Sequence, residues 1–318
     1  MMLSSLNSAD VTSRLLAIAL PAIGLMVFLT LWNGAAQRID TSLGQFPGPG
    51  EVWKQSANLV EEHKAQRAKA AAFYERQEKR NAAKLAKNPE YEAKIRRYTG
   101  KPTFFDQVST SLVTVMLGFL AAAIIAVPIG IMVGLSQPLY TAVNPLIQLF
   151  KPVSPLAWLP LVTMVVSALY VTDDPTVPKS FLNSMITVML CCIWPTVINT
   201  AVGVSGVSQD HVNVSKVLRL GPLTHVFKVV LPSAIPMIFT GLRLSLGIAW
   251  MVLIAAEMLA QNPGLGKFVW DEFQNGSSNS LGRIMVAVLT IGAIGFLLDR
   301  GMLLLQRMLS WDKSAQLR

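Results

Sequence analysis

Long uncharged stretches recur along most of the chain. A helix needs about 20 apolar residues to cross the hydrocarbon core of a bilayer. Six stretches approach or exceed that length with at most one charge, and they cover residues 15–32, 112–135, 152–172, 180–209, 229–256 and 284–298. The pattern therefore predicts an all-α polytopic membrane protein with about six transmembrane helices.

The first stretch has a second interpretation, as a secretory signal. Arg14 precedes it, and Asn33-Gly34-Ala35-Ala36 follows it as a weak cleavage site. Eighteen residues is long for the apolar part of a signal, and the region before it is barely basic. We therefore expect a retained first helix.

A polar insertion separates the first two stretches. Residues 51–101 hold 20 of the 45 charged residues, and residues 46–50 before them form a Pro/Gly turn. Ala, Lys, Arg and Glu dominate residues 56–97 and favour one or two solvated helices, interrupted near Asn88-Pro89. We divide the chain into a first helix and linker (1–50), this insertion (51–104), a transmembrane domain (105–310) and a cytoplasmic tail (311–318).

Composition excludes several classes of protein. Only 14% of the residues are charged, against about a quarter in soluble proteins. The net charge of +9 lies mostly in the insertion, so nothing else offers a basic face for nucleic acid. Cys191 and Cys192 are adjacent inside an apolar stretch and predict neither a disulfide nor a metal site. Residues 264–268 lack the first glycine and the Ser/Thr of a Walker A motif, and no enzymatic motif is found.

Proline and glycine mark the apolar stretches. Residues 151–160 contain three prolines, which predict either a broken helix lining a transport path or a kink near the interface with Trp158 in the aromatic belt. Gly130 and Gly134 form a GxxxG pattern that lets two helices pack closely.

Two charges lie within or beside the fifth stretch. Arg243 is costly at that depth unless paired, so it is either a functional residue in an anion path or a structural contact with another helix. Glu257 follows fourteen residues later, about 21 Å along a straight helix, so the two cannot pair with each other.

The orientation follows from the short segments. Residues 210–228 and the C-terminal region carry a cluster of basic residues, namely Lys216, Arg219, Lys228, Arg300, Arg307, Lys313 and Arg318. Basic residues favour the cytoplasmic side. We therefore place the N-terminus, residues 137–144, this loop and the C-terminus in the cytoplasm, and the 51–101 insertion outside.

Residues 209–232 predict a short amphipathic helix, a turn, and an apolar helix that opens with Leu231-Pro232. This arrangement resembles the cytoplasmic coupling loop of ABC importer permeases. The family pattern is Glu-Ala-Ala, three residues, Gly, and about a dozen residues to Leu-Pro. On that alignment Asn213-Val214-Ser215 stands at Glu-Ala-Ala, Arg219 stands at the glycine, and Gly221 comes two residues late.

Five further stretches resemble the nitrate/nitrite branch of these permeases, which includes cyanate and bicarbonate permeases. They cover residues 151–160, 192–203, 239–246, 249–259 and 264–272. The resemblance implies an inner-membrane importer in which two permease copies form the pathway in the lipid bilayer. It also implies a soluble or lipid-anchored binding protein outside and two ABC ATPase subunits inside. The permease itself would be no enzyme and hold no cofactor, with ATP bound by the partner.

The resemblance also assigns candidate residues. The coupling loop would contact the ATPase through Asn213, Val214, Ser215, Lys216, Arg219, Gly221, Leu231 and Pro232. The candidates for the substrate pathway are Ser154, Trp158, Arg243, Trp250 and Glu257.

Other functions remain open at this point. A sulfonate or taurine permease of the same family is the nearest alternative. A stand-alone carrier or channel would favour inverted repeats or buried acidic relays, which the sequence does not show by eye. A membrane enzyme would need clustered His or carboxylates on facing helices.

Overall fold

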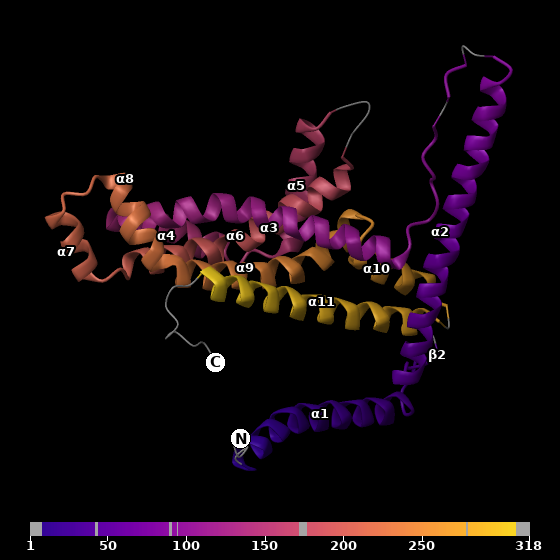
Figure 1. Ribbon diagram of the computed structural model, residues 1–318, viewed down its shortest axis with the longest axis horizontal. Coiled ribbons are helices and arrows are strands. Elements are labelled where there is room, and N and C mark those ends of the chain that lie inside the picture. Colours follow the sequence, from indigo (N-terminus) through magenta and orange to yellow (C-terminus); the bar gives the residue numbers. More distant parts are fainter. Residues whose placement is uncertain are drawn as a thin grey trace, which may run out of the picture.

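The computed structural model describes residues 8–41, 44–88, 91–93, 95–171, 177–277 and 279–309, with side chains from residue 19 onward. Helices dominate this part of the chain (Figure 1). Their bounds are α1 Ser8–Ala36, α2 Pro49–Leu85, α3 Phe104–Leu135, α4 Gln137–Phe150, α5 Pro155–Leu169, α6 Lys179–Ser205, α7 Gln209–Val217, α8 Pro222–His225, the π-helix η1 Val226–Val230, α9 Leu231–Ala260, α10 Leu265–Asn275 and α11 Ser280–Leu309. Strands β1 (Asp40–Thr41) and β2 (Gly44–Gln45) pair antiparallel, with Asp40 opposite Gln45.

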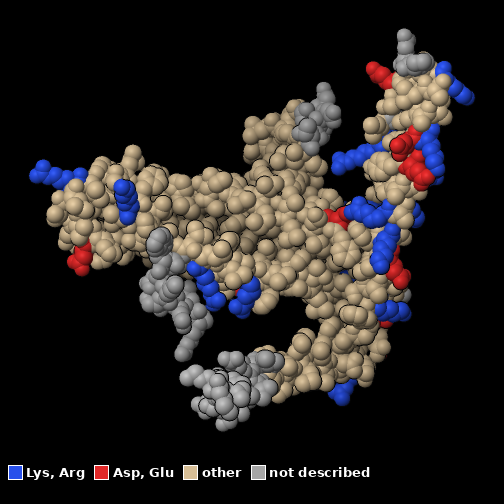
Figure 2. Space-filling view, viewed as in Figure 1, with Lys and Arg blue, Asp and Glu red and all other residues tan. Residues whose placement is uncertain are grey.

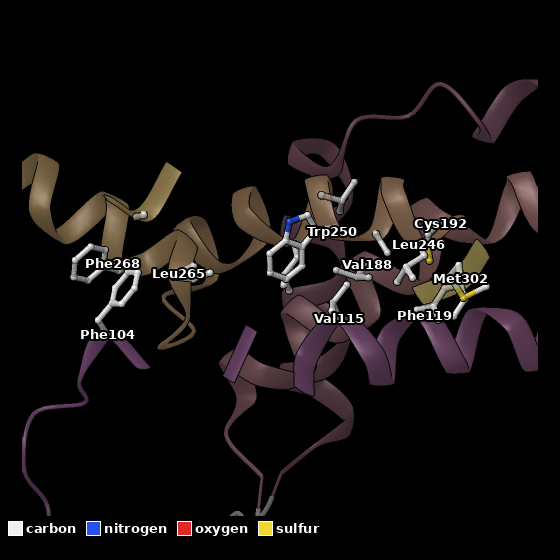
Figure 3. Close-up of a cluster of buried hydrophobic side chains, with 14 of the residues drawn as sticks. Phe104, Val115, Phe119, Val188, Cys192, Leu246, Trp250, Leu265, Phe268 and Met302 are labelled. Carbon is white, nitrogen blue, oxygen red and sulfur yellow. The ribbon is translucent and has the colours of Figure 1, made fainter. Parts of the chain in front are cut away.

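Four long helices, α3, α6, α9 and α11, form the bundle (Figure 1). Helix α6 packs closely on both α3 and α9 because small residues lie at the crossings. A Cβ atom at Gly203 would lie 2.7 Å from Met237 Cβ, and one at Gly241 would lie 2.8 Å from Asn199 Cβ. Figure 3 shows the apolar cluster between these helices, where Val115 is fully buried.

Within the described residues, five helices are long and apolar enough to cross a membrane, or six if the bent pair α4–α5 counts as one span. Of the span predicted over residues 152–172, residues 155–169 form α5, which meets α4 at an angle of 100° and is therefore part of a bent pair. Residues 137–144, assigned above to the cytoplasmic side, form the start of α4. Pro155 lacks an N–H group and disfavours a helical Ser154, so the helix restarts at this point.

Helix α5 is too short to span a bilayer alone. Its 15 residues rise about 22 Å, against a hydrocarbon core of about 30 Å. It leaves the bundle sideways (Figure 1) and exposes large apolar side chains along its length. These are Leu156, Leu161, Met164, Val165 and Leu169. A surface of this kind needs a partner or lipid to cover it.

The polar insertion folds as one helix rather than two in the part described. Helix α2 spans 37 residues and ends at Leu85, after which residues 91–93 and 95–103 are not helical. It crosses the end of the bundle beside α10 and α11 (Figure 1). The predicted break at Pro89 and the tail at 311–318 lie outside the described residues.

Two further differences concern the last part of the chain. Helix α11 is twice as long as the predicted stretch at 284–298, because Asp299 and Arg300 lie inside it rather than ending it. The short amphipathic helix α10 was not predicted, since its 11 residues include three charges and cannot span a membrane.

Candidate functional site

Helix α7 and the turn after it form one end of the molecule, opposite α2 and α10 (Figure 1). Ser208 begins the helix by accepting a hydrogen bond from Asp210 N at 3.3 Å. The turn after the helix passes through Arg219, whose φ of 47° is in the left-handed region. Arg219 occupies the position at which the resemblance expected glycine, so the backbone keeps a glycine-like turn without the glycine. Gly221 has φ −64° and caps α8 instead.

A buried hydrogen bond closes this turn. Ser215 is 4% exposed, and its Oγ lies 2.7 Å from Nδ1 of His225. The backbone N–H of Leu220 also donates to Ser215 O at 3.1 Å. Ser215 therefore fixes the shape of the loop and is not available at its surface. Sequence reasoning missed His225, although a serine and a histidine on either side of a turn could have suggested the pair.

The outer face of α7 and α8 is apolar and exposed. Val217 is 81% exposed and Leu223 75%, and Val214, Leu218 and Phe227 are also exposed. Asn213, Lys216 and Arg219 lie beside them at the surface. An apolar centre with a basic rim is typical of a protein docking site. Of the candidates at this loop, Asn213, Val214, Lys216 and Arg219 are exposed, whereas Ser215 is buried and Leu231 and Pro232 begin α9.

The loop joins α9 without a flexible break. The π-turn η1 follows α8 and continues directly into Leu231 and Pro232 at the start of α9. Residues 222–260 thus form one continuous helical segment of 39 residues.

The elbow between α4 and α5 holds two pathway candidates. The Ser154 hydroxyl caps α5 by accepting from Leu156 N at 3.3 Å. Phe150 packs on Trp158, with ring centroids 5.9 Å apart, and stacks on Trp194 at 6.1 Å. The indole Nε1 atoms of Trp158 and Trp194 are buried, and neither finds an acceptor within the described part of the chain. Buried donors of this kind normally have partners, so the elbow offers two free N–H groups.

Arg243 forms an ion pair between α9 and α11. Its Nε and Nη2 atoms donate to the two carboxylate oxygens of Asp299, and the Nη2–Oδ2 distance is 3.0 Å. Both side chains are a little over one third exposed in the absence of a membrane. The guanidinium therefore already has a bidentate partner on a neighbouring helix.

Trp250 and Glu257 are buried inside the fold. Trp250, labelled in Figure 3, is 6% exposed, and its Nε1 donates to Ile291 O on α11 at 2.9 Å. Glu257 is 0% exposed and accepts from Gly266 N at 3.0 Å, and Ser111 Oγ lies 2.8 and 2.9 Å from its two oxygens. It caps the N-terminus of α10. A Cβ atom at Gly264 would collide with its carboxylate.

The remaining candidates, Gly130 and Gly134, lie where α3 crosses α6. A Cβ atom at Gly134 would lie 2.6 Å from Ala201 O, so only glycine fits there without a shift of the helices. The pathway candidates as a whole do not meet at one point. Ser154 and Trp158 share the elbow, whereas the three on α9 face α3, α10 and α11.

Metal chemistry finds no support in the geometry. Across the described ranges, no three His, Cys, Asp or Glu side chains gather as a metal site requires. The arrangement offers a docking face at one end and a broken helix beside the bundle.

Comparisons with known proteins agree on one family. Residues 126–311 match the family described as binding-protein-dependent transport system inner membrane component. The nitrate import permease of Synechocystis sp. is 38% identical over 194 residues, which are 61% of this chain and 66% of the relative. The bicarbonate transport system permease of the same organism is 41% identical over 207 residues, which are 65% and 69% of the two chains. The chain thus spans about two thirds of the length of these relatives.

The fold agrees with a solved structure of the MetNI methionine ABC transporter in an inward-facing conformation. The TM-score is 0.54 at 15% sequence identity, and the match covers 65% of this chain and 95% of the other. At this level of identity, what the two proteins share is the arrangement of their helices.

Proposed function

Because this chain belongs to the family of binding-protein-dependent transport system inner membrane components, we propose that it is the permease subunit of an ABC importer that carries nitrate or nitrite inward. It is a multi-pass inner-membrane protein. In this proposal a separate ATPase binds and hydrolyses ATP, and a separate binding protein delivers the anion.

The exposed face of α7 and α8 is the observation that carries the proposal. An apolar surface with Val217 and Leu223 largely exposed is unfavourable in water, and a motor subunit would cover it. Lys216 and Arg219 would set the orientation of that contact. Closure of the ATPases would then move the loop, and the continuous segment 222–260 would pass the movement to the bundle.

A second copy of this chain is the proposed partner at the elbow. Helix α5 leaves the bundle at 100° to α4 and exposes apolar side chains over its whole length. Its two ends carry backbone groups that lipid cannot satisfy at membrane depth. A copy related by two-fold symmetry would cover both the side chains and these ends.

The elbow is also the proposed anion path. The free indole N–H groups of Trp158 and Trp194 can donate to an oxyanion, and Lys151 lies at the same bend. Two neutral donors beside one positive charge would suit a small planar oxyanion such as nitrate. Bicarbonate is the second candidate, because its permease in Synechocystis sp. shares 41% of the aligned residues.

Transport by the reconstituted complex tests the proposal. The permease, its ATPase and its binding protein are placed in liposomes, and uptake of labelled nitrate, nitrite, bicarbonate, cyanate and taurine is compared. We expect ATP-dependent uptake of nitrate or nitrite, and none when the Walker lysine of the ATPase is replaced. Uptake that persists without the ATPase would contradict the importer assignment, and uptake of taurine alone would contradict the substrate.

Charge reversal at the loop tests the coupling. Lys216→Glu or Arg219→Glu should lower stimulated ATPase activity while the protein still inserts and purifies with its normal elution volume. Lys54→Glu, an exposed change near the start of α2 and far from the loop, serves as the control. Normal stimulation in both loop variants would contradict the assignment of α7.

A further inference from the structure

The second half of α2 extends beyond the bundle at the end opposite α7 (Figure 1). We call residues 68–85 of α2, together with the described residues 86–88, 91–93 and 95–101, the basic arm. The base of the helix is fixed to the bundle. Gln55 Nε2 donates to Asn279 Oδ1 at 3.1 Å, and Arg283 forms an ion pair with Glu62.

The returning chain stiffens the arm along its length. Arg96 N donates to Gln77 Oε1 at 2.8 Å, and Tyr98 N donates to Tyr74 Oη at 3.1 Å. The rings of Phe73 and Tyr98 lie 5.5 Å apart. Because the returning segment is hydrogen-bonded to α2 along one face, the arm is a rigid projection and not a loose loop.

Charge is concentrated on the arm. Residues 68–101 contain ten Lys and Arg against four Glu. Figure 2 shows Lys and Arg along the arm, whereas the middle of the bundle is nearly free of charge on this face. At 3.6 residues per turn, Lys69, Arg76 and Arg80 lie within about 40° of one another on α2. Glu75 lies on another side of the helix and pairs with Lys79 at 2.6 Å.

The arm has no apolar face left for a membrane. An amphipathic helix that binds lipid presents a broad row of large apolar side chains. The apolar face of α2 is instead turned inward, where Leu59 is buried and Phe73 packs on Tyr98. In the described part of the arm, the exposed large hydrophobic residues are Tyr74, Leu85 and Ile95. This surface suits a hydrophilic acidic partner better than lipid.

We infer that the basic arm is the docking surface for an acidic face of the soluble binding protein. The inference rests on the proposed function, which places α7 in the cytoplasm and therefore the arm outside. The arm projects from the same side of the bundle as α5 (Figure 1), the side assigned above to the second copy. It would therefore overhang the outer mouth of the pathway, where the anion is released. The family match begins at residue 126, so the arm lies outside the shared domain.

Charge reversal on one face of the arm tests this docking. The variant Lys69→Glu/Arg80→Glu/Lys87→Glu changes three exposed residues, and no contact within the described residues joins any of these side chains to an acidic group. ATPase activity of the full complex in liposomes is measured against the concentration of its binding protein. Steering by complementary charge raises association rates about 10- to 1,000-fold. We expect the half-saturating concentration to rise about tenfold, with the rate at saturation retained and the difference shrinking at high salt.

Two controls isolate the charge and its position. Lys69→Arg/Arg80→Lys/Lys87→Arg keeps the charge and should behave as wild type. Lys64→Glu, about 140° around the helix from Lys69, is compared with Lys69→Glu alone, which changes the same amount of charge, and should have the smaller effect. All assays are repeated in liposomes with and without anionic lipid.

The outcomes separate the possible failures. An unchanged half-saturating concentration in the triple variant overturns the docking inference. An effect that occurs only with anionic lipid also overturns it, in favour of lipid binding. If the wild-type complex hydrolyses and transports without any response to the binding protein, the proposed function fails and the inference fails with it.

Discussion

The ion pair between Arg243 and Asp299 allows a structural contact to be separated from a transport role. Arg243 lies 17 residues before the end of α9 at Ala260, about 26 Å along the helix, and 21 residues after Pro222. It is therefore near the middle of the continuous segment. An arginine at the centre of a membrane helix costs about 2.5–3.5 kcal/mol on insertion scales. The bidentate contact with Asp299 offsets that cost.

Asp299→Asn removes the carboxylate and leaves the guanidinium without its charged partner. We expect it to lower the free energy of unfolding by about 2–3 kcal/mol, close to the insertion cost of the charge. The double variant Arg243→Leu/Asp299→Leu removes both charges and should lie within about 1 kcal/mol of wild type, because apolar pairs often replace ion pairs without loss. Unfolding of the purified protein in bicelles, followed by circular dichroism against added denaturant, measures both values.

Anion uptake by the same variants decides between the two roles. If the pair only joins α9 to α11, the double variant should transport as wild type does. A double variant as unstable as Asp299→Asn would refute the energetic reasoning. A stable double variant without uptake would show that the pair has a role in transport beyond joining the two helices.

Three further predictions concern the loop and the packing of the bundle. Ser215→Ala and His225→Ala should each raise the hydrogen exchange of α7, and a double-mutant cycle should give a coupling energy of about 1 kcal/mol, whereas additive effects would contradict the bond at 2.7 Å. Gly130→Ala should destabilise the protein by about 1–3 kcal/mol because its Cβ atom would meet Thr200 on α6, while Gly247→Ala, with nothing within 4 Å, should be neutral or stabilising by melting temperature. Arg219→Gly should stabilise the left-handed turn by about 1 kcal/mol and still weaken ATPase stimulation, and full stimulation would show that the turn matters and the charge does not.

Hydrophobic pattern was sufficient to predict the all-α fold and the approximate number of spans. It was sufficient because an uncharged stretch such as residues 112–135 can hardly cross a bilayer in any form other than a helix. The pattern also predicted α7 as a short helix before the fifth span. Its bounds, Gln209–Val217, begin at a serine cap that the sequence itself contains.

Pattern alone could not predict the elbow. The three prolines of residues 151–160 indicated a break, but the angle of 100° depends on how α4 packs on α3 and how α5 packs on α6. Hydropathy also cannot show that Glu257 caps α10, since the partners Ser111 and Gly266 are far apart in sequence. The partner of Arg243 was not predicted either, because Asp299 was taken to mark the end of a span.

The break at residues 151–154 has a consequence for how long a lone copy can survive. Regular helix hydrogen bonds end there: Lys151 N still donates to Ile147 O, but Pro152 has no N–H group to donate to Gln148 O. Until a second subunit covers this break, a newly inserted chain would expose polar backbone groups to the lipid acyl chains. We therefore expect solitary copies to be short-lived, and the cell's supply of this subunit to be limited by how quickly two of them meet.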